Sequence, residues 1–162
     1  MSATAPSRSW HGVQITEQDG LSVAIVGSRS FPFEQAPVRC VEAVGQALLD
    51  TGWPVAEVVS GGADGVDTAA AALADVGNIP LTVLEPDWDT YGEGAGPRRN
   101  TRIVQRADAV LAFWNGTSPG TRDTLAKARA VLGDDQIALR GIGDTTVGLR
   151  QIEPVDPAVA RS

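Results

Sequence analysis

The stretch VVSGGADGVDTAAAAL, Val58 to Leu73, joins an apolar run to an alanine-rich run through a turn with two adjacent glycines. The apolar run predicts a buried strand, and the alanine run from Thr68 to Ala74 predicts a helix that ends at Gly77. A strand, a glycine turn and a helix in this order are typical of a parallel α/β sheet. Because Asp64 and Asp67 lie at the turn, we ask whether it holds a phosphate or another polar group.

The same alternation continues on both sides of this stretch. Short apolar runs predict strands at 21–27, 55–59, 79–84, 109–114 and 137–139, and helical patterns occur at 41–48, 68–74, 101–107 and 121–132. This order predicts one Rossmann-like, doubly wound α/β domain with a mainly parallel sheet. The predicted domain spans residues 21–140, with an N-terminal extension of residues 1–20 and an irregular C-terminal tail of residues 141–162.

Composition limits the classes of function. The 162-residue chain has a formal net charge of -7, which argues against a broad basic surface for long nucleic acids. The lone cysteine, Cys40, lies in a helical pattern and is expected to be a buried thiol, and the lone histidine, His11, excludes a Ser-His-Asp triad and a histidine metal cluster. No apolar stretch is long enough for a signal peptide or a membrane span. We therefore expect a cytoplasmic protein without a metal ion or a membrane contact.

Four loops carry the candidate chemistry, because ligands of such sheets bind outside the carboxyl ends of the strands. They are GSR at 27–29, SGGADGVD at 60–67, GPRRN at 96–100 and NGTSPGT at 115–121. In the first loop, Gly27 permits a sharp turn, and Ser28 and Arg29 then present a hydroxyl and a guanidinium group, which suit a phosphate or a ribose. An ordinary glycine turn is the alternative for this loop alone.

The second loop has glycines that let a ligand approach the backbone, and it also carries two aspartates. Gly61 and Gly62 allow a ligand near the backbone, where the following helix directs its free N–H groups. Asp64 and Asp67 repel a phosphate, but either can accept a hydrogen bond from a ribose hydroxyl or cap the helix. We therefore expect this turn on the ribose side of the ligand.

Arg98 and Arg99 open a helix, where positive charge is mildly unfavourable. A bound anion would offset that cost, so we expect at least one of them to contact the ligand; the alternative is a surface ion pair with Asp87, Asp89 or Glu93.

The last loop, with Gly120 and Thr121, is either a phosphate turn or a helix start capped by a hydroxyl group. Trp88 and Tyr91 can stack on a base, and Trp114 is expected in the core.

Taken together, VAIVGSRSF, VVSGGADGVDTAA, GPRRNTRIV and LAFWNGTSPGT resemble the SLOG superfamily of Rossmann-like nucleotide-binding domains, and most of all its YspA (cpYpsA-related) branch. The resemblance covers about residues 21–139. It implies a ligand pocket lined by Gly27, Ser28, Arg29, Gly61, Gly62, Asp67, Arg99, Asn100, Gly120 and Thr121. That branch commonly has an arginine near Asp64 and an aspartate near Asn115, so this chain departs from it at both places.

Two other members of the superfamily imply alternative functions. LOG enzymes hydrolyse nucleoside monophosphates and carry a PGGxGTxxE motif; aligning its GT with Gly120 and Thr121 puts Thr124 at the glutamate. Asp123 is one residue away, which is about 100 degrees around a helix, so a phosphoribohydrolase would use Arg99 and a displaced Asp123. The DNA-processing protein A binds single-stranded DNA.

The leading prediction is binding of a small nucleotide or an NAD-derived nucleotide, in a sensing, sequestering or processing role. The nucleotide is the ligand or the substrate, so no further cofactor is expected. We also expect a homo-oligomer, and nucleic acid is the less favoured partner because of the acidic charge.

Overall fold

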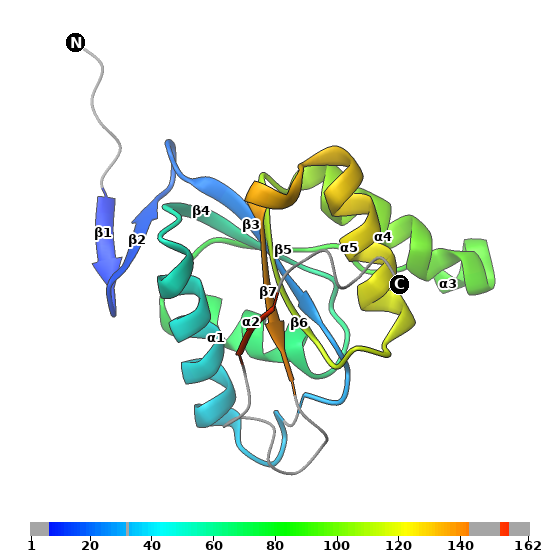
Figure 1. Cartoon of the computed structure of the whole chain (residues 1–162), viewed down its shortest axis with the longest axis horizontal. Helices are drawn as coiled ribbons and strands as arrows, with labels where there is room; N and C mark the ends of the chain where they lie inside the picture. The colour runs from blue at the N-terminus through cyan, green and yellow to red at the C-terminus, as the bar shows by residue number, and fades with distance from the viewer. Residues whose placement is uncertain (1–6, 32, 143–152, 156–162) are drawn as a thin grey trace.

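The computed structural model describes residues 7–31, 33–142 and 153–155, in which strands and helices alternate (Figure 1). The strands are β1 (Ser7–Trp10), β2 (Val13–Thr16), β3 (Leu21–Gly27), β4 (Val55–Ser60), β5 (Leu81–Val83), β6 (Ala109–Trp114), β7 (Ile137–Gly141) and β8 (Glu153–Val155). The helices are α1 (Pro37–Thr51), α2 (Val66–Val76), α3 (Trp88–Tyr91), α4 (Ala95–Arg106) and α5 (Pro119–Val131), with 3-10 turns η1 (Gly92–Gly94) and η2 (Asp134–Gln136).

The described strands form one mainly parallel sheet in the order β1-β2-β4-β3-β6-β7-β8, with β5 paired beside β4. The pairs formed by β2, β3, β4, β5, β6 and β7 are parallel, whereas β1 with β2 and β7 with β8 are antiparallel. The predicted Rossmann-like, doubly wound α/β fold is therefore confirmed. The strand order reverses between β3 and β6, so the loops after these two strands leave in different directions.

Helices cover both faces of the sheet, and strand β3 shows how the sequence produces this arrangement. Val23 and Ile25 belong to the core beneath α1 and α2, whereas Ala24 and Val26 belong to the core beneath α4 and α5. Successive side chains of a strand point to opposite faces, so a continuous apolar run serves two cores at once. Figure 1 shows α1 and α2 on one side of the sheet and α4 and α5 on the other.

Several predicted boundaries agree with the structure. Strands 21–27 and 109–114 match β3 and β6. The helical pattern at 41–48 lies within α1, which ends at Thr51 and is capped by Gly52, whose φ of 71° is the left-handed conformation that favours glycine. Cys40 is buried in α1, and burial raises the pKa of its thiol to about 11. The third strand is shorter than predicted, because β5 lies beside β4 alone and keeps only three residues in the ladder.

The predicted N-terminal extension requires correction. Residues 7–16 form a hairpin, and β2 pairs in parallel with β4 through Ile15 and Val55. Val13 and Ile15 are buried in the core, so the alternation VQIT is an amphipathic strand. His11 and Gly12, with φ of 46° and 88°, form the two-residue turn.

The C-terminal tail is partly structured as well. Glu153–Val155 pairs antiparallel with β7, whereas an irregular tail was predicted from residue 141 onwards. The rest of that predicted tail, 143–152 and 156–162, lies outside the described residues. In the described part of the chain, no helix has the length and apolar character that a membrane span requires.

Candidate functional site

A cavity of about 420 Å³ opens where the strand order reverses. Its walls come from the loops after β3 and β6, the starts of α2 and α5, and the inner side of α4. The cavity is lined by Val26, Gly27, Ser28, Arg29, Ser30, Ala63, Asp67, Arg99, Asn100, Ile103, Asn115, Ser118, Pro119, Gly120, Thr121 and Thr124. All four loops singled out in the sequence therefore meet at one place.

The structure brings most of the predicted site residues into this lining. They are Gly27, Ser28, Arg29, Asp67, Arg99, Asn100, Gly120 and Thr121. Gly61 and Gly62 do not line the cavity: a Cβ atom on Gly61 would lie 2.5 Å from Nη1 of Arg99 and 3.0 Å from Oδ2 of Asp67. The space that Gly61 leaves is thus occupied by two side chains of the site and not by a ligand.

Asp67 is the acidic side chain of the lining. It stands in the first turn of α2, is only 6% exposed, and accepts the N–H of Ala63 at 3.1 Å and the N–H of Gly61. Burial raises the pKa of its carboxyl to about 6, against the opposing effects of those N–H groups and of Arg99 and Arg29. At neutral pH Asp67 is mostly ionised, yet it is held close to its titration point.

Arg99 is half-buried, and its guanidinium group lies over Gly61 together with the carboxyl group of Asp67. Its guanidinium donates through Nη1 to the carbonyl of Gly61 and through Nε to Oδ1 of Asn100 at 2.9 Å. Burial lowers the pKa of Arg99, while the attraction of Asp67 raises it. Arg29 is exposed, so one guanidinium group reaches the cavity from the loop after β3 and the other from α4.

Arg98 differs from its neighbour. It lies outside the cavity lining, and its guanidinium carbon stands 4.2 Å above the centre of the Tyr91 ring. Among the described residues, no ion pair joins Arg98 or Arg99 to Asp87, Asp89 or Glu93, so the alternative of a surface ion pair is wrong. Of this adjacent pair, Arg99 is the residue that reaches the pocket.

Ser28 and Asn115 tie the loops after β3 and β6 together. The hydroxyl of Ser28, which is buried, accepts the N–H of Asn115 at 3.1 Å. The side chain of Asn115 in turn accepts the N–H groups of Thr117 at 3.0 Å and Ser118 at 2.8 Å. These bonds shape the turn that leads into α5.

Asn100 connects α4 to α5. Its amide nitrogen donates to the carbonyl of Gly120 at 3.3 Å and to Oδ2 of Asp123 at 3.1 Å. Asp123 also forms an ion pair with Lys127 at 2.8 Å and does not line the cavity. The 100° helix rotation expected from the sequence therefore directs Asp123 towards Lys127.

The first turn of α5 leaves room for a ligand. A Cβ atom on Gly120 would meet nothing within 4 Å, and α5 has no acidic residue in its first turn. Its first N–H groups lack partners within the helix, as at any helix start. Thr124, at the position of the LOG glutamate, is buried and donates to the carbonyl of Gly120 at 3.2 Å.

Some lining residues were missed in the sequence. Ile103 lies four residues after Arg99 on the same side of α4, so helical spacing could have identified it. Ser30 and Ala63 gave no such signal, because only the folded loops bring them to the cavity. Gly65, which lies outside the lining, gave no signal either: its φ is 82°, and a Cβ there would lie 2.6 Å from the carbonyl oxygen of Ser28.

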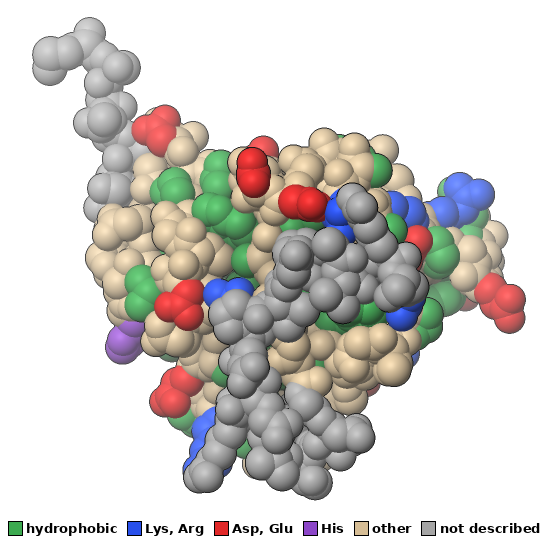
Figure 2. Space-filling model, in the orientation of Figure 1, with side chains coloured by type: hydrophobic (Ala, Val, Ile, Leu, Met, Phe, Trp, Pro, Cys, Tyr) green, Lys and Arg blue, Asp and Glu red, His purple; other side chains and the backbone are tan. Residues whose placement is uncertain are grey.

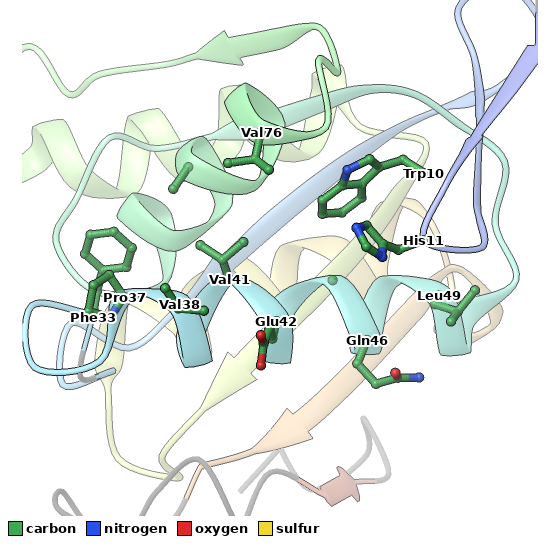
Figure 3. A pocket seen from close by; sticks show the side chains of 12 residues that line it. Trp10, His11, Phe33, Pro37, Val38, Val41, Glu42, Gln46, Leu49 and Val76 are labelled. Atoms are coloured by element: carbon green, nitrogen blue, oxygen red, sulfur yellow. The ribbon is translucent and has the colours of Figure 1, made fainter.

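A second hollow, the apolar groove, has a different character. It encloses about 660 Å³ between α1, α2 and the turn of the β1–β2 hairpin. Figure 3 shows Phe33 at one end, Trp10 and His11 at the other, and apolar side chains of both helices between them. The apolar groove lacks the paired guanidinium groups of the first cavity.

Comparison with known proteins identifies the family. The model of the family described as DNA recombination-mediator protein A matches residues 10–129. The chain belongs to this family. The match confirms the relation to the SLOG superfamily, and it begins within the hairpin that the structure adds to the sheet. No curated protein and no solved structure matches the chain.

Family membership and geometry agree on the coarse description. The chain is a Rossmann-like domain of a kind compatible with nucleotide or DNA-processing roles. Among the described residues, no three His, Cys, Asp or Glu side chains gather in a way that could hold a metal ion.

Proposed function

We propose that the cavity at the end of β3 and β6 binds a nucleotide. The observation that carries this proposal is the meeting of Arg29 and Arg99 with the first turn of α5, where Gly120 leaves open space. Guanidinium groups and helix N–H groups are the usual donors to phosphate. A sensing, sequestering or processing role follows from such binding.

The remaining walls suit the rest of a nucleotide. The carboxylate of Asp67 can accept hydrogen bonds from ribose hydroxyls, and the hydroxyl groups of Ser28 and Ser30 can donate to a ligand. Val26 and Ile103 provide an apolar wall for a sugar or a base. A cavity of about 420 Å³ falls within the size range of small-molecule sites.

Arg99→Ala tests the proposal, with Arg98→Ala as its matched control. Mix each protein with AMP, ADP-ribose, NAD and cyclic ADP-ribose, and measure thermal shifts and calorimetric affinities. We expect Arg99→Ala to weaken binding by about 10- to 100-fold, because a charge-assisted contact is lost. Arg98→Ala should leave mononucleotide binding unchanged. The proposal fails if no nucleotide stabilises the native protein and none co-purifies with it in native mass spectrometry.

Binding of single-stranded DNA is the second candidate, and the family match favours it. Trp88 and Tyr91 are 52% and 46% exposed, and Arg98 stacks on Tyr91. Figure 1 shows α3 projecting at one end of the molecule, and Figure 2 shows both basic and acidic side chains at that end. Aromatic and arginine side chains are typical contacts to unpaired bases.

A gel shift with a short oligothymidylate at low salt separates the two candidates. Strand binding predicts that Trp88→Ala and Arg98→Ala release the oligonucleotide and that AMP does not compete. Pocket binding predicts the reverse: Arg99→Ala has the larger effect, and AMP competes. The net charge of -7 favours the second outcome, since phosphate contacts dominate strand affinity.

Hydrolysis of the nucleotide has less support. The acid that it would use, Asp123, is bonded to Asn100 and Lys127 outside the cavity lining. Incubation of the protein with AMP and detection of free adenine by chromatography tests this activity. Release of adenine that Asp123→Ala leaves intact would exclude Asp123 as the acid.

A further inference from the structure

The cavity lining has few charged side chains, and their net charge is small. They are the guanidinium groups of Arg29 and Arg99 and the carboxylate of Asp67; the other lining side chains are neutral. At neutral pH the lining therefore carries one net positive charge. A ligand that brings several negative charges meets little compensation there.

Asp67 is fixed in its place. Its carboxylate accepts N–H groups from Ala63 and Gly61, and its side chain is almost wholly buried at the start of α2. Arg99 cannot turn fully towards a ligand either, because it donates to the carbonyl of Gly61 in the loop after β4 and to the side chain of Asn100 beside it in α4. The carboxyl group of Asp67 thus stays in the pocket when a ligand enters.

The same residue makes the two helix starts at the cavity unequal. α2 has Asp67 in its first turn, where its carboxylate offsets the positive end of the helix dipole. α5 has no acidic residue in its first turn. One helix start is therefore free to face a phosphate, and a second phosphate group would lie towards a carboxylate.

We infer that Asp67 limits the ligand of this pocket to a single phosphate group and excludes di- and triphosphates. This inference rests on the proposed nucleotide binding and adds the charge class of the ligand. A monoester phosphate carries about -1.5 to -2 charges at pH 7, which two guanidinium groups and one helix start can balance. Each further phosphate adds a charge that Asp67 repels.

The first test compares adenosine, AMP, ADP and ATP by isothermal titration calorimetry in buffer with EDTA, and repeats the series with guanosine nucleotides. We expect AMP to bind best and affinity to fall on the order of tenfold for each added phosphate, as Coulomb's law predicts for partly buried charges. ADP or ATP binding as tightly as AMP would overturn the inference while nucleotide binding stood. Binding of none of these ligands would remove both.

The variant Asp67→Asn tests whether Asp67 causes the preference for AMP over ATP. The variant removes one negative charge but keeps an oxygen that can accept the N–H of Ala63. We expect ATP to gain on the order of 100-fold more affinity than AMP does, because its two additional charges no longer meet a carboxylate. An unchanged ratio of ATP to AMP affinity in a folded variant, as judged by circular dichroism, would refute the inference.

Measuring the ratio of AMP to ATP affinity at several pH values tests the role of Asp67 in the native protein, without a variant. The terminal phosphates of AMP and ATP both titrate near pH 6, so their loss of charge cancels in the ratio of the two affinities. The charged side chains that act on Asp67 are Arg99 from α4 and Arg29 from the loop after β3, and both stay positive over this range. Since burial raises the pKa of Asp67 to about 6, the preference for AMP over ATP should weaken on going from about pH 7.5 to about pH 5. A constant preference would count against Asp67.

Discussion

The polar cavity is smaller than the apolar groove, but it holds more of the charged side chains. The groove encloses about 660 Å³ and the cavity about 420 Å³, yet the two guanidinium groups and the buried carboxylate belong to the smaller one. The groove is lined mainly by apolar side chains, with Glu42 and Gln46 beside them. Volume therefore does not identify the site of a charged ligand, whereas the convergence of polar groups does.

Their positions in the fold explain this difference. The cavity lies where the strand order reverses, so four loops with special residues converge on it. The groove runs along the outer side of helices that already cover the sheet, and it leaves Val38 and Val76 68% and 64% exposed. The position of the cavity follows from the strand order, whereas the groove results from the apolar side chains on the outer surface of α1 and α2.

Replacing one glycine by alanine at the cavity and one at the groove should give the largest difference in unfolding free energy between the two regions. An alanine at Gly27 would place its Cβ against the carbonyl oxygen of Phe113 and 2.6 Å from Cγ2 of Val66, where the seam between β3 and α2 cannot open. We expect Gly27→Ala to lose about 3 kcal/mol or more of unfolding free energy.

The matched variant is Gly45→Ala in α1, where the nearest atom to the new Cβ would be Cδ1 of Leu73 at 3.4 Å. Helix propensity then predicts no loss and a gain of up to about 1 kcal/mol. Urea unfolding curves measure both changes. Equal destabilisation by the two variants would show that the seam beneath the cavity is no tighter than α1.

The pH dependence of stability offers a second contrast, because the cavity holds a buried carboxylate and Glu42 of the groove is exposed. The pKa of Asp67 is raised in the folded protein to about 6, so the folded state binds the proton more tightly than the unfolded state does. Its contribution to stability is full below the ordinary aspartate pKa and is lost as the pH rises through about 6. Between about pH 5 and about pH 7 the loss should be about 1.4 kcal/mol.

Asp67→Asn supplies the control for this pH scan. Urea unfolding at several pH values should show a steeper fall for the native protein than for the variant. Glu57 does not disturb the comparison, because its hydrogen bond from Arg106 lowers its pKa in the native protein and in the variant alike. Parallel pH profiles would show that Asp67 has an ordinary pKa.

The fold was largely predictable because its strands are apolar on both sides. The run at β3 and the run at β6 can be buried only in a parallel sheet with two covered faces, and their bounds were correct. The hairpin was missed because its strands are short and mostly polar. The alternation of Val13 and Ile15 with polar residues, followed back to the His11–Gly12 turn, was the available signal.

The site was predictable to the level of loops but not of side-chain direction. Topology alone brings Ser28, Asp67, Arg99 and Gly120 to one edge of the sheet. Which side chains reach the cavity depends on bonds between distant segments, such as Arg99 to the carbonyl of Gly61. No sequence pattern specifies these contacts. The sequence predicted that Gly61 lets a ligand approach the backbone, whereas in the structure Gly61 makes room for the side chain of Arg99.

Gly61→Ala tests that reassignment and should have a smaller effect. Its Cβ would displace the guanidinium of Arg99, which is the end of a flexible side chain, and would crowd Oδ2 of Asp67 at 3.0 Å, so we expect a loss of about 1 kcal/mol, smaller than for Gly27→Ala. Nucleotide affinity should fall on the order of tenfold, because Arg99 no longer holds its position at the cavity. Gly94→Ala is the control, since its nearest neighbour would be Nε of Arg98 at 4.0 Å. Calorimetry of AMP binding would contradict this account if the two variants bound equally.

The smallest effect is expected from the groove itself. Val38→Ser and Val76→Ser change exposed apolar side chains, so the unfolding free energy should stay within about 0.5 kcal/mol of the native value. AMP affinity should be the same as in the native protein, because neither residue lines the polar cavity. A loss of AMP affinity in these variants, with the Arg99→Ala protein still binding, would move the nucleotide site to the groove. That outcome would mean that apolar stacking, and not phosphate recognition, carries the binding.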